Sequence, residues 1–273
     1  MTLQHFFGHR LALTLAGCLL AQGTQAALSL DRSRIVFNEG EKSVSLSVRN
    51  LNDSTPFLVQ SWLEDAKEEK INGPLMALPP LQRIDADSKS VVRLQALTDI
   101  TTLPKDRESL FYFNLREIPP KSEKSNTLTL ALQTRIKVFY RPAALKVDPV
   151  KSWVPGMGEL TLEKKGDSVE AVNPGAYHVT FVGALKEKAL VKNFDAVMVP
   201  PKGRSTLSVK SNQLGNNPAL VFINDYGGQL QQVFHCSGTI CKAGEITEPE
   251  LKKPVESKTE KAKQGETGKK DKS

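Results

Sequence analysis

The sequence predicts an all-β protein built from two sandwich domains. Short runs of residues alternate between apolar and polar side chains, turn-forming residues separate these runs, and helical periodicity is scarce. Alternation with a period of two places every second side chain on one face of a strand, which suits a half-buried sheet. A chain of 273 residues is long enough for two domains of ordinary size.

The first half of the chain contains about seven such runs. Val44, Leu46 and Val48 alternate with polar neighbours, so we expect them to face inward. The run 28–37 requires a kink or a change of sheet midway, and the adjacent prolines of the run 75–80 make it an edge strand, because proline cannot donate to a ladder. This strand spacing is typical of an immunoglobulin-like sandwich. The predicted strands cover residues 28–37, 43–49, 57–63, 75–80, 90–96, 110–118 and 128–140.

The second half is also predicted to be all-β. Residues 142–152 resemble a linker, and 225–228 form a hairpin-type turn rich in glycine. The domain ends near a pair of cysteines. Its predicted strands cover residues 160–162, 168–172, 178–182, 196–199, 205–209, 219–223 and 230–234.

The N-terminal residues 1–26 have the pattern of a secretory signal peptide. Arg10 precedes the apolar run 11–20, and a small-x-small cleavage site at 24–26 leaves Ala27 as the mature N-terminus. The apolar run is shorter than the ~20 residues that span a bilayer. We therefore expect an exported, soluble protein.

Two alternatives remain for this leader. It could stay uncleaved as an anchor, or Leu15-Ala-Gly-Cys18 could serve as a lipoprotein cleavage site. The apolar run continues beyond Cys18 and a better cleavage site follows, which favours an ordinary signal peptide.

Removal of the signal peptide leaves two cysteines, Cys236 and Cys241. An even pair in an exported chain indicates a disulfide, here closing a tight local loop. The alternative is a zinc site that also uses His235, but it lacks a convincing fourth ligand. We expect no metal.

The segment 243–273 differs from the rest of the chain. Lys and Glu dominate it and apolar residues are almost absent, so we expect a disordered tail. The formal net charge of +7 is spread along the chain, without a basic cluster among aromatic residues or a basic amphipathic helix. These observations argue against nucleic-acid binding and against a role at the membrane surface. No later segment is long and apolar enough for membrane insertion.

Signatures of enzymes are largely absent from the sequence. There is no phosphate-binding loop and no nucleophile elbow. His178 and His235 lie in strand-like runs, where packing or surface roles are expected. We expect no catalytic residue and no cofactor, which leaves a binding protein.

Several motifs resemble the periplasmic pilus chaperones of the PapD type. They are the block Arg107-Glu-Ser-Leu-Phe-Tyr-Phe-Asn-Leu-Arg-Glu-Ile-Pro-Pro120, the block Lys137-Val-Phe-Tyr-Arg-Pro142 and the block Ile223-Asn-Asp-Tyr-Gly-Gly228. The resemblance runs from Ala27 to about Lys242. It implies two immunoglobulin-like domains in a boomerang arrangement, at 27–146 and 147–242.

The resemblance also implies a function. Members of this family are ATP-independent chaperones that bind, fold and cap pilus (fimbrial) subunits in the periplasm and deliver them to an outer-membrane usher. A subunit lacks its last strand, and the chaperone lends one of its own by donor-strand complementation. Partners would thus be subunits and usher, and we expect the unloaded protein to protect its donor strand by self-association or nearby disorder.

The lent strand would be residues 126–133, with Leu128, Leu130 and Leu132 filling the groove of the subunit. Periodicity alone leaves a second interpretation open, in which these leucines fill the core of the chaperone itself. By resemblance, Arg34 and Lys137 bind the C-terminal carboxylate of the subunit in the cleft between the domains and so fix the register of the strand.

Glu108, Arg141 and Asp225 match a family ion cluster that sets the angle between the domains, a structural role. The connection 121–125 is short and neither flanking strand contains cysteine, which indicates the short-loop branch of the family. The rival hypotheses are a two-domain immunoglobulin-like adhesin without an exposed donor strand and an exported hydrolase with a convergent site.

Overall fold

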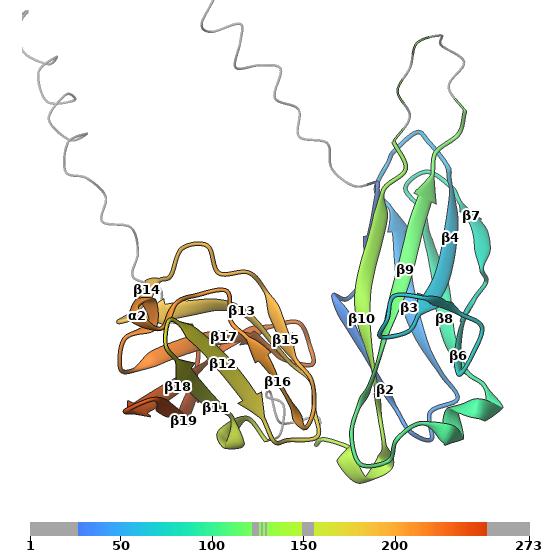
Figure 1. The fold of residues 1–273 in the computed structure, drawn as a ribbon. Helices are drawn as coiled ribbons and strands as arrows, with labels where there is room; N and C mark the ends of the chain where they lie inside the picture. Colours follow the sequence, from blue (N-terminus) through green and yellow to red (C-terminus); the bar gives the residue numbers. More distant parts are fainter. Residues whose placement is uncertain (1–26, 122–125, 127, 129, 149–155, 250–273) are drawn as a thin grey trace, which may run out of the picture. The chain divides into compact units, whose positions relative to one another are not determined.

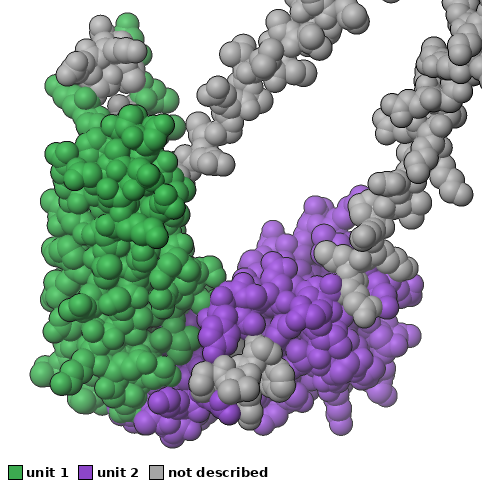
Figure 2. Space-filling view, turned by 180° about the vertical axis from the view of Figure 1, so that it is seen from behind, with its two compact units in different colours: residues 1–103, 110–138 green, residues 104–109, 139–273 purple. Residues whose placement is uncertain are grey.

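The structure is a computed structural model that describes residues 27–121, 126, 128, 130–148 and 156–249. The predicted signal peptide, residues 250–273 of the predicted tail and most of the connection 121–125 lie outside the described residues. The chain divides into two compact units, each described by itself below (Figures 1 and 2). The first takes Met1–Leu103 and Leu110–Val138, and the second takes Pro104–Ser109 and Phe139–Ser273.

Two antiparallel sheets build the first unit. One has the strand order β1-β3-β8-β6, and the other has the order β2-β10-β9-β4-β5, with β7 beside β4. A short 3₁₀ helix, Thr98–Thr102, follows β8. The strands are β1 (Leu28–Leu30), β2 (Arg34–Asn38), β3 (Ser43–Asn50), β4 (Phe57–Glu64), β5 (Lys70–Ile71), β6 (Leu75–Leu78), β7 (Leu81–Ile84), β8 (Lys89–Ala96), β9 (Ser109–Ile118) and β10 (Gln133–Arg141).

Alternation predicted the buried faces of these strands well. Leu46 and Val48 are fully buried, although Val44, the second residue of β3, is only partly covered. The run 28–37 divides into β1 and β2, which lie in different sheets, so the change of sheet occurs where it was expected. The strand β6 ends its sheet, as the following prolines require.

The strand β10 begins later than the prediction. The pattern indicated a strand from Leu128, but the first residue of β10 is Gln133. Leu128, Leu130 and Leu132 are 82%, 60% and 42% exposed. The alternating leucines therefore extend beyond β10 to positions where the first unit does not bury them.

The second unit is one sheet that folds over on itself. Its strand order is β14-β13-β17-β18-β19-β11-β12-β16, with β15 beside β13. Phe222 on β17 and Leu162 on β11 come from separate parts of this order yet share one core. The strands are β11 (Thr161–Lys165), β12 (Ser168–Asn173), β13 (Val179–Lys186), β14 (Ala189–Leu190), β15 (Val197–Val199), β16 (Gly203–Thr206), β17 (Pro218–Ile223), β18 (Gln229–Ser237) and β19 (Ile240–Thr247). Its helical turns are Ala143–Leu145, Met157–Glu159 and α2 (Ser211–Leu214).

The final strand, β19, extends five residues beyond Lys242, where we expected the folded domain to end and the tail to begin. Ala243 and Ile246 pack against the core of the second unit, and the Ala243 N–H donates to the Leu160 carbonyl at 3.1 Å. These two side chains and the continued pairing with β18 keep this stretch in the sheet. The tail starts later than the composition indicated.

The predicted disulfide between Cys236 and Cys241 is confirmed. The two residues face one another in the register of β18 and β19. Gly238 in the connecting turn has φ +61°, a left-handed conformation that favours glycine. The bond closes a hairpin that borders the core, since Cys241 is fully buried. None of the helices among the described residues is long and apolar enough to cross a membrane.

Candidate functional site

Three leucines at alternate positions precede β10. Leu128, Leu130 and Leu132 all belong to the exposed large apolar residues of the chain, and exposure falls steadily toward the strand. They do not fill the core of the first unit, so the second interpretation left open by periodicity is wrong. An apolar series of this kind exposed at one strand end is typical of a surface that a partner covers.

The base of this segment is attached to the sheet through Glu117. The Glu117 N–H donates to the Leu132 carbonyl at 3.0 Å. Glu117 lies near the end of β9, which neighbours β10 in its sheet. The end of the leucine segment next to β10 is therefore held against β9 by a backbone hydrogen bond.

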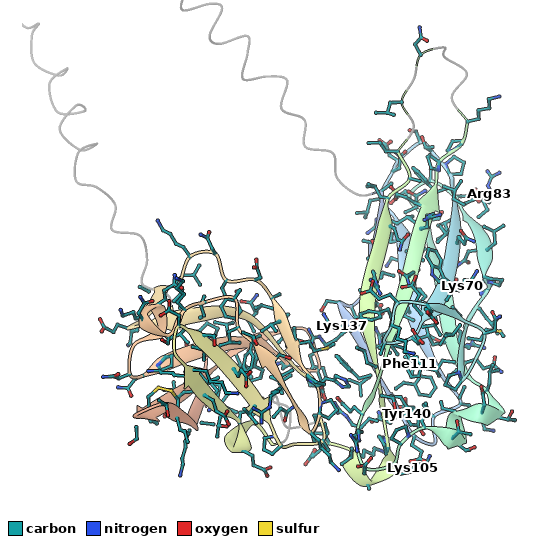
Figure 3. All side chains as sticks on the ribbon, viewed as in Figure 1. Lys70, Arg83, Lys105, Phe111, Lys137 and Tyr140 are labelled. Carbon is teal, nitrogen blue, oxygen red and sulfur yellow. A yellow bond between two sulfur atoms is a disulfide. The ribbon has the colours of Figure 1, made fainter. Side chains whose placement is uncertain are left out.

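Lys137 lies on β10, five positions after Leu132. Figure 3 labels it among the side chains. Burial lowers the pKa of Lys137, and the positive charges of Arg34 and Arg135 lower the pKa further. Arg34 is 8% exposed on β2, the strand beside β10. The structure thus brings the two predicted anchor residues into electrostatic contact.

Arg135, on the same strand, is a cation whose charge is compensated by neighbouring carboxylates. It forms ion pairs of 3.1 Å with Glu64 and 3.0 Å with Glu68, and its guanidinium lies 3.9 Å from the centre of the Tyr112 ring. Among the described residues, no Asp or Glu forms an ion pair with Lys137. A half-buried lysine beside another cation favours an anionic ligand, because the anion offsets both burial and repulsion.

The predicted ion cluster lies within the second unit, which includes all three of its members. Arg141 donates to Glu108 Oε1 from Nε at 2.9 Å and from Nη2 at 2.8 Å. It also donates to Asp225 Oδ2 from Nη1 at 2.7 Å and to Oδ1 from Nη2 at 3.1 Å. The structure therefore brings together three residues that the sequence separates widely.

The sequence did not point to His178 as part of this cluster. Its backbone N–H donates to Glu108 Oε2 at 2.7 Å, and its ring Nδ1 lies 3.3 Å from the same oxygen. The imidazole packs against Phe139, with ring centres 5.4 Å apart. His178 is thus a buried structural residue, one of the two roles that its strand-like context indicated.

The alternative zinc site does not form with the ligands considered for it. Cys236 and Cys241 are joined in the disulfide, and His235 lies on the surface, 3.3 Å from Glu245. Within the described ranges, no three His, Cys, Asp or Glu side chains gather as metal ligands would.

Comparisons with known proteins identify the family. The family model "Pili and flagellar-assembly chaperone, PapD N-terminal domain" matches residues 27–146, and "Pili assembly chaperone PapD, C-terminal domain" matches residues 155–234. The chaperone protein PapD of Escherichia coli is 48% identical over 222 residues, which are 80% of this chain and 90% of PapD. The chain belongs to the PapD family of pilus-assembly chaperones. This membership favours the chaperone hypothesis over the adhesin.

Other PapD-family chaperones show similar agreement. The probable fimbrial chaperone YfcS of Escherichia coli K12 is 43% identical over 238 residues, which are 86% of this chain and 93% of that protein. A solved structure of the Salmonella enterica SafA pilin in complex with the SafB chaperone matches with a TM-score of 0.64 and 25% identity. It covers 76% of this chain and 95% of the matched one. The all-β, two-domain architecture is that of this family.

Proposed function

We propose that the protein caps pilus subunits in the periplasm by lending them the segment 126–133. The observation that carries this proposal is the row of exposed leucines leading directly to the uncompensated Lys137. The complex of the SafA pilin with the SafB chaperone supports a subunit as the partner.

The leucine segment supplies the binding energy and the shape. A subunit that lacks a strand exposes an apolar groove and unpaired main-chain groups. Main-chain hydrogen bonds from 126–133 satisfy that edge, and Leu128, Leu130 and Leu132 enter the groove. Each leucine contributes about 1.5–3 kcal/mol if the subunit buries it fully. Without a subunit, the same leucines favour self-association.

The cations supply the register. Arg34 and Lys137 bind the C-terminal carboxylate of the subunit through charge-assisted hydrogen bonds, which are about twice as strong as neutral ones. A slip of one residue turns every leucine out of the groove, so a fixed end point matters. The subunit is later released to the tighter packing of the next subunit at the outer-membrane usher.

The remaining assignments follow from the same function. Residues 1–26 direct export and are removed. Residues 27–146 form the domain that carries the donor segment and both anchor cations, and 147–242 form the second domain of the fold, which β19 extends to Thr247. No chemical step is required of any residue, because capture and release are binding equilibria.

A pull-down from the periplasm tests the proposal. The tagged protein is co-expressed with its genuine pilus subunits beside Lys137→Ala and the matched control Lys164→Ala, another half-buried lysine that donates to the Gly215 carbonyl at 2.9 Å. We expect subunits with the wild type and the control, and none with Lys137→Ala. Equal capture by all three would disprove the carboxylate anchor, and no capture by any of them would disprove the chaperone function for these subunits.

A further inference from the structure

Glu117 is a carboxylate on the core-facing side of β9. It is 6% exposed and continues the inward series of Phe111, Phe113 and Leu115. A carboxylate in such a position is costly unless charged or hydrogen-bonded partners compensate it.

Three backbone amides face this carboxylate. Burial raises the pKa of Glu117, and hydrogen bonds from the amides of Leu28, Leu132 and Ala27 act in the opposite direction. Ala27 is itself held in place, because its carbonyl accepts from the Leu51 N–H at 2.6 Å, next to the pairing of β1 with β3. The Ala27 nitrogen is therefore positioned at the Glu117 side chain by the fold.

We propose that the α-ammonium of Ala27, created when the leader is removed, forms an ion pair with Glu117, and that this pair makes Glu117 the positioning residue for the donor segment. The inference rests on the proposed export and cleavage. Hydrolysis of the peptide bond between Ala26 and Ala27 consumes one water molecule and leaves a carboxylate on Ala26 and an amine on Ala27. The nitrogen that faces Glu117 is the same atom before and after cleavage.

The charge changes the strength of this contact. The α-amino group has an ordinary pKa of about 7.7–8.0, so it is mainly protonated at neutral pH. It then offers a positive charge and three donors in place of one neutral N–H. The amide contact already has an ionised acceptor, so cleavage adds the attraction between two opposite charges, which is stronger at a buried site than in water. Leader removal thus provides a buried carboxylate with a charged partner that the precursor lacks.

The donor segment is linked to this pair through Leu132. Glu117 contacts that residue twice, since its N–H donates to the Leu132 carbonyl and its carboxylate accepts from the Leu132 amide. Both contacts fix the backbone just before β10 begins, at the last of the three exposed leucines. A firmly held base lowers the entropy that capture of a subunit must overcome.

A double-mutant cycle on the full chain from Ala27 tests the ion pair. The free amine and an acetylated amine are compared in the wild type and in Glu117→Gln by urea unfolding. In the wild type we expect acetylation to lower the folding equilibrium constant about tenfold, which corresponds to about 1.4 kcal/mol. In Glu117→Gln we expect less than a twofold change. Equal effects in both backgrounds would overturn the proposal.

The reactivity of the amine provides a second readout that a merely structural role of Glu117 would not change. At neutral pH we expect the wild-type Ala27 amine to react with an acylating reagent at least tenfold more slowly than a variant extended by two glycines. This comparison does not depend on whether Glu117→Gln folds. Equal rates, or a mass of the exported protein showing that Ala27 is not its first residue, would contradict the inference.

Subunit capture separates this inference from the proposed function. We expect acetylation and Glu117→Gln each to reduce capture by at least threefold, and their combination to reduce it no further, because both remove the same pair. Undiminished capture by the acetylated protein would leave the chaperone function intact and overturn the positioning role alone.

Discussion

Two cations four positions apart on β10, Lys137 and Arg141, have opposite surroundings. The Arg141 side chain is 3% exposed and pairs with two carboxylates at 2.7–2.8 Å. Lys137 is half-buried, and the charges that act on it are those of Arg34 and Arg135, both positive. Among the residues that the structure describes, carboxylates neutralise Arg141 but none forms an ion pair with Lys137.

This difference separates a structural charge from a binding charge. A buried ion pair stabilises little over an apolar pair, but removing one member leaves the other buried and uncompensated. An uncompensated cation instead lowers the stability of the free protein and is relieved when an anion binds. The contrast assigns Arg141 to the architecture of the second unit and supports Lys137 as the anchor for a carboxylate.

The largest effect is expected for Arg141→Met. Loss of the guanidinium leaves the buried Glu108 and the partly buried Asp225 unpaired. We expect the free energy of unfolding, measured in urea, to fall by about 3–5 kcal/mol. The control is Arg204→Met, because Arg204 is 55% exposed and its ion pairs with Glu163 and Glu170 lie on the surface.

The control should change stability by no more than about 0.5 kcal/mol. A loss below about 1 kcal/mol in Arg141→Met would remove the distinction between the two cations of β10. The cluster would then contribute no more than ordinary surface pairs do.

Leu130→Glu tests the same distinction, between residues that stabilise the fold and residues that bind a partner, at an apolar position. Leu130 is 60% exposed, so a charge there should leave the free energy of unfolding within about 0.5 kcal/mol of wild type. In a subunit groove the same charge would be buried without a partner, and we expect capture to fall by about 100-fold. Leu190→Glu, at 61% exposure on β14, is the matched control and should capture normally. Unfolding of Leu130→Glu would show instead that the leucine stabilises the free protein.

Alternation predicted most of the fold because the buried faces of these sheets are continuous. It succeeded for Leu46, Val48 and the other inward residues of long strands. It could not predict β5 or β14, which have two residues each and exist through pairing with a neighbour. The pattern also failed to predict the strand β19, because the few residues of this strand that contact the core are surrounded by polar residues in the sequence.

The candidate site was less accessible to sequence reasoning alone. Glu108 lies 33 positions from Arg141, and Asp225 lies 84 positions from it, so no local pattern connects them. Their assignment came from the family resemblance. Glu117, in contrast, has a local signal in the sequence, because it occupies the same alternate positions as Phe113 and Leu115 in a core-facing series.

The carboxylate anchor can be tested with a peptide that has the C-terminal sequence of a pilus subunit. A free terminal carboxylate should bind more tightly than the amidated peptide by about 10–100-fold, since hydrogen bonds to charged groups are worth about 1.5–3 kcal/mol. In Lys137→Ala this preference should shrink toward unity, whereas Lys164→Ala should retain it. The measurement is calorimetric titration of both peptides. If the wild type binds both peptides with equal affinity, Lys137 does not bind the terminal carboxylate.

The smallest effect is expected for Lys137→Met in the absence of any subunit. Removing a charge that is half-buried beside Arg34 should raise the free energy of unfolding at neutral pH by up to about 1 kcal/mol, the upper range for partly exposed charges. The variant is therefore expected to gain stability while it loses the proposed anchor, the opposite of Arg141→Met.

The pH dependence gives the sign of this effect independently. The folded-state pKa of Lys137 lies below its ordinary value of 10.5, mainly through burial. Between the two values the unfolded chain binds more protons than the native protein, so this lysine makes stability rise with pH there. Other groups titrate in the same range, so the test is the difference between wild type and Lys137→Met in urea unfolding at increasing pH. We expect the difference in the free energy of unfolding between Lys137→Met and wild type to shrink as the pH approaches 10.5, because wild-type Lys137 then loses its charge. An advantage that stays constant with pH would mean that packing, rather than the uncompensated charge, distinguishes the two side chains.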